Sequence, residues 1–204
     1  MKLNFDFALT THCQAKCRSC ARTNPETGEK ADWLELRHMD LGVFRKTLEN
    51  SSTEIEQIQF CGEFGDPMMH PEVEQFVDTA LEYSNFVNIN TNGGLRGQEW
   101  YTMMANKYPR RLSIKWGIDG TDAETNSKYR EGVNWDRAMR NMRSWFSSGG
   151  QGSWHFLIFE WNWHQVTEAK KLAQDIGCQI QFKVNNRLWG RISPENLVKL
   201  KDLL

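Results

Sequence analysis

Three of the five cysteines in this chain fall within eight residues, at Cys13, Cys17 and Cys20. Soft thiolates bunched this closely suit an iron–sulfur cluster. A closed four-iron cluster takes four cysteines, so three leave one iron without a protein ligand. An open coordination position is typical of a catalytic metal rather than a structural one. The CxxxCxxC spacing therefore predicts a [4Fe-4S] cluster with chemistry to perform.

Two plainer explanations of the triplet compete with the cluster. Positions 13, 17 and 20 share one face of a helix, where cysteine would serve as a small hydrophobic residue. That stripe does not continue, because Thr10 and Asn24 in the same register are polar. A zinc site is the second alternative, but zinc prefers four ligands. His12 as the fourth ligand would need a strained loop beside Cys13, so we favour the cluster.

Composition limits the class of protein. A chain of 204 residues is long enough for one domain with a sizeable core, and we expect residues 1–204 to form a single domain. The net charge of -1 gives no broad basic field for nucleic acid. An odd number of cysteines, three of them bunched, is no disulfide framework and fits a reducing compartment. Without an apolar N-terminal segment or a membrane-spanning run, we expect a cytoplasmic protein with no membrane contact.

The elements that must position the cysteines alternate between strands and helices. Strands are expected at residues 3–9, 55–61, 86–91, 112–118, 154–161 and 179–184. The glycines of 149–152 are expected to end the helix that precedes the fifth strand. Helices are expected at 41–48, 71–83, 98–106, 134–146, 165–176 and from 193 onward. This alternation implies a parallel sheet, in which ligands bind at the carboxyl ends of the strands. The cysteine segment directly follows the first strand.

Short polar or glycine-containing motifs follow the other strands. The sequence CGEFGDP at residues 61–67 follows the second strand, with Gly65 to allow close backbone approach and Pro67 to fix the turn. NTNGG at 90–94 follows the third strand, and GIDG at 117–120 follows the fourth. YREG stands at 129–132, and FEWN ends at Asn162 after the fifth strand. Taken alone, these are ordinary turns, a surface arginine and a helix N-cap.

Together, the cysteine triplet and these motifs resemble the radical S-adenosylmethionine (radical SAM) enzymes over nearly the whole chain. The resemblance implies an α/β fold, a partial (β/α)6 barrel of the TIM-barrel-like type. It implies that SAM binds the open iron and that an electron from the cluster breaks the sulfonium C–S bond. The resulting 5'-deoxyadenosyl radical then takes a hydrogen atom from a substrate. It also implies an electron donor such as flavodoxin or ferredoxin.

The resemblance extends to residues that would bind SAM. In the family, the glycine-rich turn meets the amino group of SAM, which here corresponds to Gly65, Asp66 and Pro67. Asp66 stands where the family usually has glutamate, a change that keeps the charge. Asn92 matches the Thr-Asn-Gly motif, whose asparagine is placed to hydrogen-bond polar atoms of SAM.

The later motifs supply the other end of the expected SAM site. Asp119 lies in a motif that resembles Ser-x-Asp-Gly, with Gly117 in place of the serine. Arg130 resembles the arginine of Tyr-Arg-x-Gly and would grip the carboxylate of SAM. Asn162 matches an asparagine that contacts the adenosine end, or it is an N-cap for the next helix. Ser19 replaces the aromatic residue that commonly packs by adenine, so other groups, such as Phe64, would hold the base.

The substrate is not named by any residue. Six strands cannot close an eight-stranded barrel, so the open side favours a peptide or other large molecule. Nucleotide or tRNA modification and a non-catalytic iron–sulfur or zinc module are the alternatives, although the near-neutral charge disfavours nucleic acid. The polar loop 23–39 is either a lid over the barrel mouth or a solvated connection.

The two remaining cysteines and the length of the chain complete the expectations. Cys61 and Cys178 are single cysteines on strands, for which core packing is expected. No cysteine follows Cys178, so no C-terminal extension for auxiliary clusters is expected. This compact form resembles the small radical SAM proteins of phage and bacterial genomes.

Overall fold

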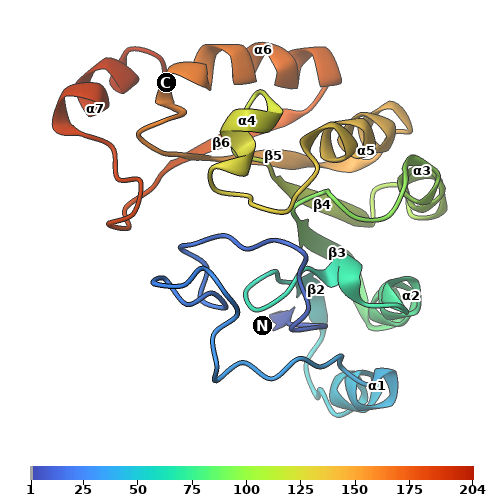
Figure 1. Cartoon of the computed structure of the whole chain (residues 1–204). Helices are drawn as coiled ribbons and strands as arrows, with labels where there is room; N and C mark the ends of the chain where they lie inside the picture. Colours follow the sequence, from blue (N-terminus) through green and yellow to red (C-terminus); the bar gives the residue numbers. More distant parts are fainter. Residues whose placement is uncertain (1) are drawn as a thin grey trace.

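A single six-stranded parallel sheet forms the centre of the protein in the computed structural model, which describes residues 2–204. The strand order is the order of the chain, so each strand pairs only with its neighbours in sequence (Figure 1). The first and last strands are both edges, and the partial (β/α)6 barrel expected from the sequence is confirmed. The strands are β1 (Leu3–Phe7), β2 (Ile55–Phe60), β3 (Ser84–Thr91), β4 (Leu112–Gly117), β5 (Gln151–Ile158) and β6 (Gln179–Val184).

Helices follow the strands and cover the convex face of the sheet (Figure 1). They are α1 (Leu41–Glu49), α2 (Val73–Tyr83), α3 (Gln98–Lys107), α4 (Ala123–Ser127), α5 (Trp135–Ser147), α6 (Val166–Ile176) and α7 (Pro194–Lys201), with 3-10 turns η1 (Pro67–Met69) and η2 (Trp163–Gln165). Side chains of Asp40, Asn134 and Ser193 cap α1, α5 and α7 by accepting from backbone N–H groups. None of the helices in the described range has the length and apolar character needed to span a membrane.

The hydrophobic core lies between the convex face of the sheet and these helices. Burying one large apolar side chain is worth about 1.5–3 kcal/mol, so this layer supplies most of the stability. Its fully buried strand residues include Ile58, Phe60, Val87, Ile89, Ile114, Trp116, Trp154 and Phe156, and its helix residues include Phe44, Phe76, Met104, Met142 and Trp145.

The concave face of the sheet is polar, unlike the packed apolar interior of a closed (β/α)8 barrel. Side chains alternate between the two faces of a strand, and the positions between the core residues carry Gln59, Asn90, Lys115, His155 and Lys183. All of these line a cavity. The interior of this partial barrel is therefore a lined space rather than a second core.

The sequence placed most strands within three residues of their observed bounds, and β5 shows the largest difference. The helix α5 does end before the glycines at 149–152, as predicted, but the strand expected from Trp154 begins three residues earlier, at Gln151. Gly152 adopts φ 147°, and a Cβ there would lie 1.9 Å from the carbonyl oxygen of Ile114. Glycine thus lets β5 approach β4 closely, so it belongs to the sheet. In addition, α2 begins at Val73 rather than at Pro71, and α4 was not expected.

Candidate functional site

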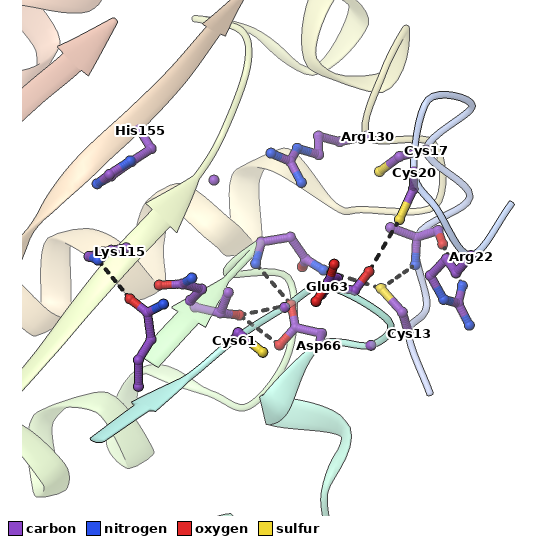
Figure 2. A pocket seen from close by; sticks show the side chains of 18 of the residues that line it. Cys13, Cys17, Cys20, Arg22, Cys61, Glu63, Asp66, Lys115, Arg130 and His155 are labelled. Carbon is purple, nitrogen blue, oxygen red and sulfur yellow. Dashed lines mark hydrogen bonds between the residues drawn. The ribbon is translucent and has the colours of Figure 1, made fainter. Parts of the chain in front are cut away.

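A cavity of about 680 Å³ opens on the concave side of the sheet, within the range of about 300–1,000 Å³ usual for ligand sites. Strands β2 to β6 and the loop after β1 all contribute to its wall. Figure 2 shows the three cysteines on one side of it, and Lys115 and His155 on the opposite side. The predicted site residues that line it are Cys13, Cys17, Cys20, Gly65, Asp66, Asn92 and Arg130.

The cysteine loop is held by backbone contacts and by one buried arginine. Arg22, 7% exposed, donates to the carbonyl oxygens of Thr11 (3.1 Å), Ala15 (3.2 Å) and Phe64 (3.2 Å). Three carbonyls from two segments thus converge on one guanidinium. The sequence analysis did not identify Arg22, although a charged residue two positions after the last cysteine was a visible signal. Its place in the fold is structural: it fixes the path of the loop.

The thiols lie in surroundings that disfavour their charged form. Burial raises the pKa of Cys13 to about 12, and the nearby Asp66 carboxylate adds to the effect. Burial also raises the pKa of Cys17. A bound cation reverses this balance, because a metal deprotonates the thiol that coordinates it. The backbone N–H of Ala15 (3.4 Å) and the Nδ2 of Asn92 (3.8 Å) already donate to the Cys13 sulfur.

The three cysteines supply the kind of donors that an iron–sulfur cluster needs, three thiolates on the wall of one cavity. Within residues 2–204, no three His, Cys, Asp or Glu side chains converge on one ion position. A four-iron cluster binds each cysteine through a different iron, so Cys13, Cys17 and Cys20 are the residues that would hold it.

Asp66 joins the glycine-rich turn to the end of β3. Its carboxylate, 3% exposed, accepts from the N–H of Met68 (3.0 Å), the hydroxyl of Thr91 (2.9 Å) and the N–H of Asn92 (2.9 Å). Burial raises the pKa of Asp66, while these hydrogen bonds oppose the shift. Asp66 thus positions Asn92, and its oxygens are already engaged within the protein.

Gly65 and Asn92 hold the cysteine loop against the ends of the strands. A Cβ at Gly65 would lie 2.2 Å from the carbonyl oxygen of Thr10, so only glycine lets the loop pass there. The Oδ1 of Asn92 accepts from the Nε2 of Gln14 (2.7 Å) and from the N–H of Gly94 (2.9 Å). Pro67 opens η1 and is buried behind the cavity wall.

Arg130 and Asp119 form a largely buried ion pair beside Cys17. The Nε of Arg130 lies 2.6 Å from an Asp119 carboxylate oxygen, and Asp119 is fully buried. Its other oxygen accepts from the N–H of Leu157 (2.7 Å). A Cβ at Gly117 would lie 2.8 Å from the Nη2 of Arg130. The glycine in place of the expected serine therefore makes room for the guanidinium, which faces the cavity.

Asn162 is fully buried and does not line the cavity. Its Nδ2 donates to the carbonyl oxygens of Asp119 (2.9 Å) and Leu157 (3.0 Å), and its Oδ1 accepts from the N–H of Phe159 (2.6 Å). The N-cap alternative is wrong, since its side chain makes no capping hydrogen bond. Asn162 supports the Asp119 backbone, and its direct contact with SAM stays a prediction.

The sequence analysis missed the wall opposite the cysteines. It includes Lys115 and His155 (Figure 2), Gln59, which is hydrogen-bonded to Lys115, and Lys183 on the neighbouring strand β6. The sequence did contain a signal for this wall. Strands that are buried on both faces have nearly continuous apolar sequences, whereas these strands alternate between apolar and polar residues, which indicates a polar face. Cys61, expected in the core, is partly exposed and also lines the cavity, so the expectation of core packing was wrong for it.

Comparison with known proteins supports the same fold. No family model and no curated protein matches the chain. Among solved structures, anSMEcpe with bound AdoMet (SAM) superposes with a TM-score of 0.76 at 15% identity, covering 100% of this chain and 57% of that one. Streptococcus suis SuiB bound to S-adenosylmethionine gives 0.71 at 14% identity, with 99% and 46% covered.

Methylornithine synthase (PylB) gives a TM-score of 0.64 at 14% identity, with 99% of this chain and 62% of that chain covered. The chain thus spans about half to three fifths of the length of these proteins. At such identities the likeness establishes the fold. The chain has the partial (β/α)6 barrel of the radical SAM type, as its motifs indicate.

Proposed function

We propose that this chain is a radical SAM enzyme core that binds a [4Fe-4S] cluster on Cys13, Cys17 and Cys20, with SAM beside it. One observation carries the proposal: the cysteines lie on the wall of the same cavity as Gly65, Asn92 and Arg130. This cavity sits on a fold shared with structures that contain AdoMet.

In this proposal the side chains of the chain orient SAM and leave the chemistry to the cofactors. When bound, the cluster supplies the electron that cleaves SAM to methionine and a 5'-deoxyadenosyl radical, which takes hydrogen from the substrate. Arg130, fixed through its Nε by Asp119, offers its remaining N–H groups to the SAM carboxylate. The backbone at Gly65 receives the amino group, and Asn92 holds polar atoms between them.

A peptide or another large molecule is the proposed substrate. The sheet is open at both edges, which leaves one side of the cavity accessible. Two structures with this fold were solved with peptides, SuiB with its precursor peptide SuiA and anSMEcpe with the Cp18Cys peptide. A flavodoxin or ferredoxin would supply the electron. Nucleotide or tRNA modification by the same chemistry is the second candidate.

The test is anaerobic reconstitution with iron and sulfide. We expect a brown protein that produces 5'-deoxyadenosine from SAM and dithionite, while Cys13→Ala, Cys17→Ala and Cys20→Ala each lose iron and activity. Cys178→Ala is the matched control, since Cys178 is partly buried away from the cavity, and it should keep both. A colourless protein with stoichiometric zinc would refute the cluster, and a brown protein without SAM cleavage would favour a non-catalytic module.

A further inference from the structure

The wall opposite the cysteines carries a group of basic side chains that SAM binding does not use. Lys115 lies on β4, His155 on β5 and Lys183 on β6, and all three line the same cavity. We propose that this basic wall binds an anionic group, phosphate or carboxylate, of the substrate. This inference rests on the proposed function and specifies the substrate class.

The sheet register places these side chains next to one another. Lys115 pairs with Ser153, two residues before His155, and Lys183 pairs with Leu157, two residues after it. Diagonal neighbours on adjacent strands lie about 7–8 Å apart, so His155 lies between Lys115 and Lys183 in one row on the concave face. Lys183 and His155 also line an adjoining cavity of about 340 Å³.

No carboxylate neutralises this part of the cavity. The ion pairs formed by residues 2–204 include neither Lys115 nor Lys183. Asp119 lines the adjoining cavity with His155 and Lys183, but its carboxylate is paired with Arg130. Like charges brought together without a partner cost free energy, and an anionic ligand removes that cost.

The basic wall is also built in a fixed geometry. The Nζ of Lys115 donates to the Oε1 of Gln59 (2.8 Å), whose Nε2 donates in turn to Asp6 (2.9 Å). An ammonium has three N–H donors, so Lys115 keeps two for a ligand. The Nε2 of His155 lies 2.9 Å from the Ser153 hydroxyl, which fixes the ring. Burial and the nearby Lys115 charge lower the pKa of His155, which keeps the ring neutral and able to donate one N–H.

The two ends of the cavity would contact two different parts of the substrate. The cysteines and the SAM-binding residues occupy one end, and the basic wall occupies the other (Figure 2). A substrate anchored by its anionic group at the basic wall would therefore present its reacting carbon to SAM.

Calorimetry on the full-length reconstituted protein, with inorganic phosphate and with succinate at constant ionic strength, tests this inference. We expect saturable binding of at least one anion, weakened about tenfold by Lys183→Met, since this variant loses a charge-assisted contact worth about 1.5 kcal/mol. Lys183 is exposed, so the variant should fold. The matched control is Lys171→Met, an exposed lysine on α6, which should bind as the parent does.

The two anions distinguish the source of the charge. Tighter phosphate binding identifies a phosphorylated substrate, and tighter succinate binding identifies an acidic one. Absence of saturable binding, or equal binding by all variants, would overturn the basic wall as a site even if SAM cleavage is intact. Anion binding lost in Lys183→Met but retained in Lys171→Met supports the site even if the protein proves unable to cleave SAM.

Discussion

Asp66 shows how much of the site depends on one carboxylate. It accepts hydrogen bonds from the turn that carries it and from Thr91 and Asn92 at the end of β3. Asn92 in turn contacts Gln14 and the Cys13 sulfur. The motif predicted that Asp66 binds SAM. In the structure, its hydrogen bonds join three segments of the chain.

Replacing Asp66 by asparagine should therefore destabilise the protein. The new NH2 group would face donors on at least one side, and a buried group left unsatisfied costs about 1–3 kcal/mol. Denaturant unfolding of Asp66→Asn should show a loss of this size. Asp78→Asn, which removes a charge from an exposed pair with Lys107, should change the unfolding free energy far less. Equal stability of Asp66→Asn and the parent would contradict the role given to Asp66.

Gly117 offers a test of the space around Arg130. Serine, the residue usual in the resembling family, would bring a Cβ to 2.8 Å from Arg130 Nη2 and displace the guanidinium. We expect Gly117→Ser to weaken SAM binding about tenfold, and Arg130→Ala, which removes a contact worth about 1.5–3 kcal/mol, tenfold to a hundredfold. Calorimetry on the reconstituted protein measures both.

A glycine with open surroundings provides the control for this pair. A Cβ at Gly97 meets nothing within 4 Å, so Gly97→Ser should leave SAM affinity unchanged. Unaltered affinity in both Gly117→Ser and Arg130→Ala would remove Arg130 from the SAM site.

At the scale of elements, α7 is attached to the loop after β5 through Glu160. The Glu160 carboxylate accepts from the N–H of Ser193 (2.7 Å), the residue that caps α7, and from the Nδ2 of Asn196 (2.7 Å). The hydrogen bond from the Ser193 backbone and those from Asn196 and the Ser193 hydroxyl lower the pKa of Glu160 below its ordinary value of 4.5. The ionised form is thus the one that holds the helix.

This attachment should be pH-dependent. Because the folded pKa is the lower one, the stabilisation is complete well above pH 4.5 and is lost as the pH falls through the folded value. Hydrogen exchange should show α7 amides losing protection in acid before β3 and β4 do. In Glu160→Ala the α7 amides should already exchange faster at neutral pH. Glu195→Ala, an exposed change on the same helix, should have a smaller effect, and equal protection in both variants would contradict the attachment.

The elements themselves were largely predictable, because their signals are local. Alternation of apolar residues gave β1 to β4 and β6, and Asp40, Asn134 and Ser193 marked the starts of α1, α5 and α7. The first three residues of β5, Gln151 to Ser153, were missed because Gly152 was treated as part of a break. Position 152 requires glycine because the backbone of Ile114 on the neighbouring strand β4 approaches it closely. Such a contact between two strands cannot be inferred from the sequence of one segment.

The residues of the site also fall into two groups, those that local sequence motifs predicted and those that only the folded sheet brings together. The cysteines and Arg130 stand in short motifs, so sequence alone located them. Lys115, His155 and Lys183 lie far apart in the chain and form a wall only when the register of β4, β5 and β6 is known. One basic residue in a single strand is not a signal of a site. The three form a basic group only because the sheet brings the three strands together.

At the scale of the whole molecule, the open sheet has two separate faces with separate tasks. The convex face and its helices carry the core, and the concave face carries the polar cavity. Most side chains that line the cavity therefore lie outside the core, although Arg22 and Asp66 line the cavity and also hold segments of the chain together. Substitutions on the concave face, such as that of Lys183, should alter ligand binding with little effect on folding.

The identity of strand order and chain order has a consequence for how the protein is made. Each strand finds its partner in the segment synthesised just before it, so no pairing waits for the two chain ends to meet. The cysteine loop is the exception, because Lys16 donates to the carbonyl oxygen of Glu131 (2.9 Å), more than half the chain later. The segment that leaves the ribosome among the first is thus completed only after β4 has formed, and Cys13, Cys17 and Cys20 acquire their final positions late in folding.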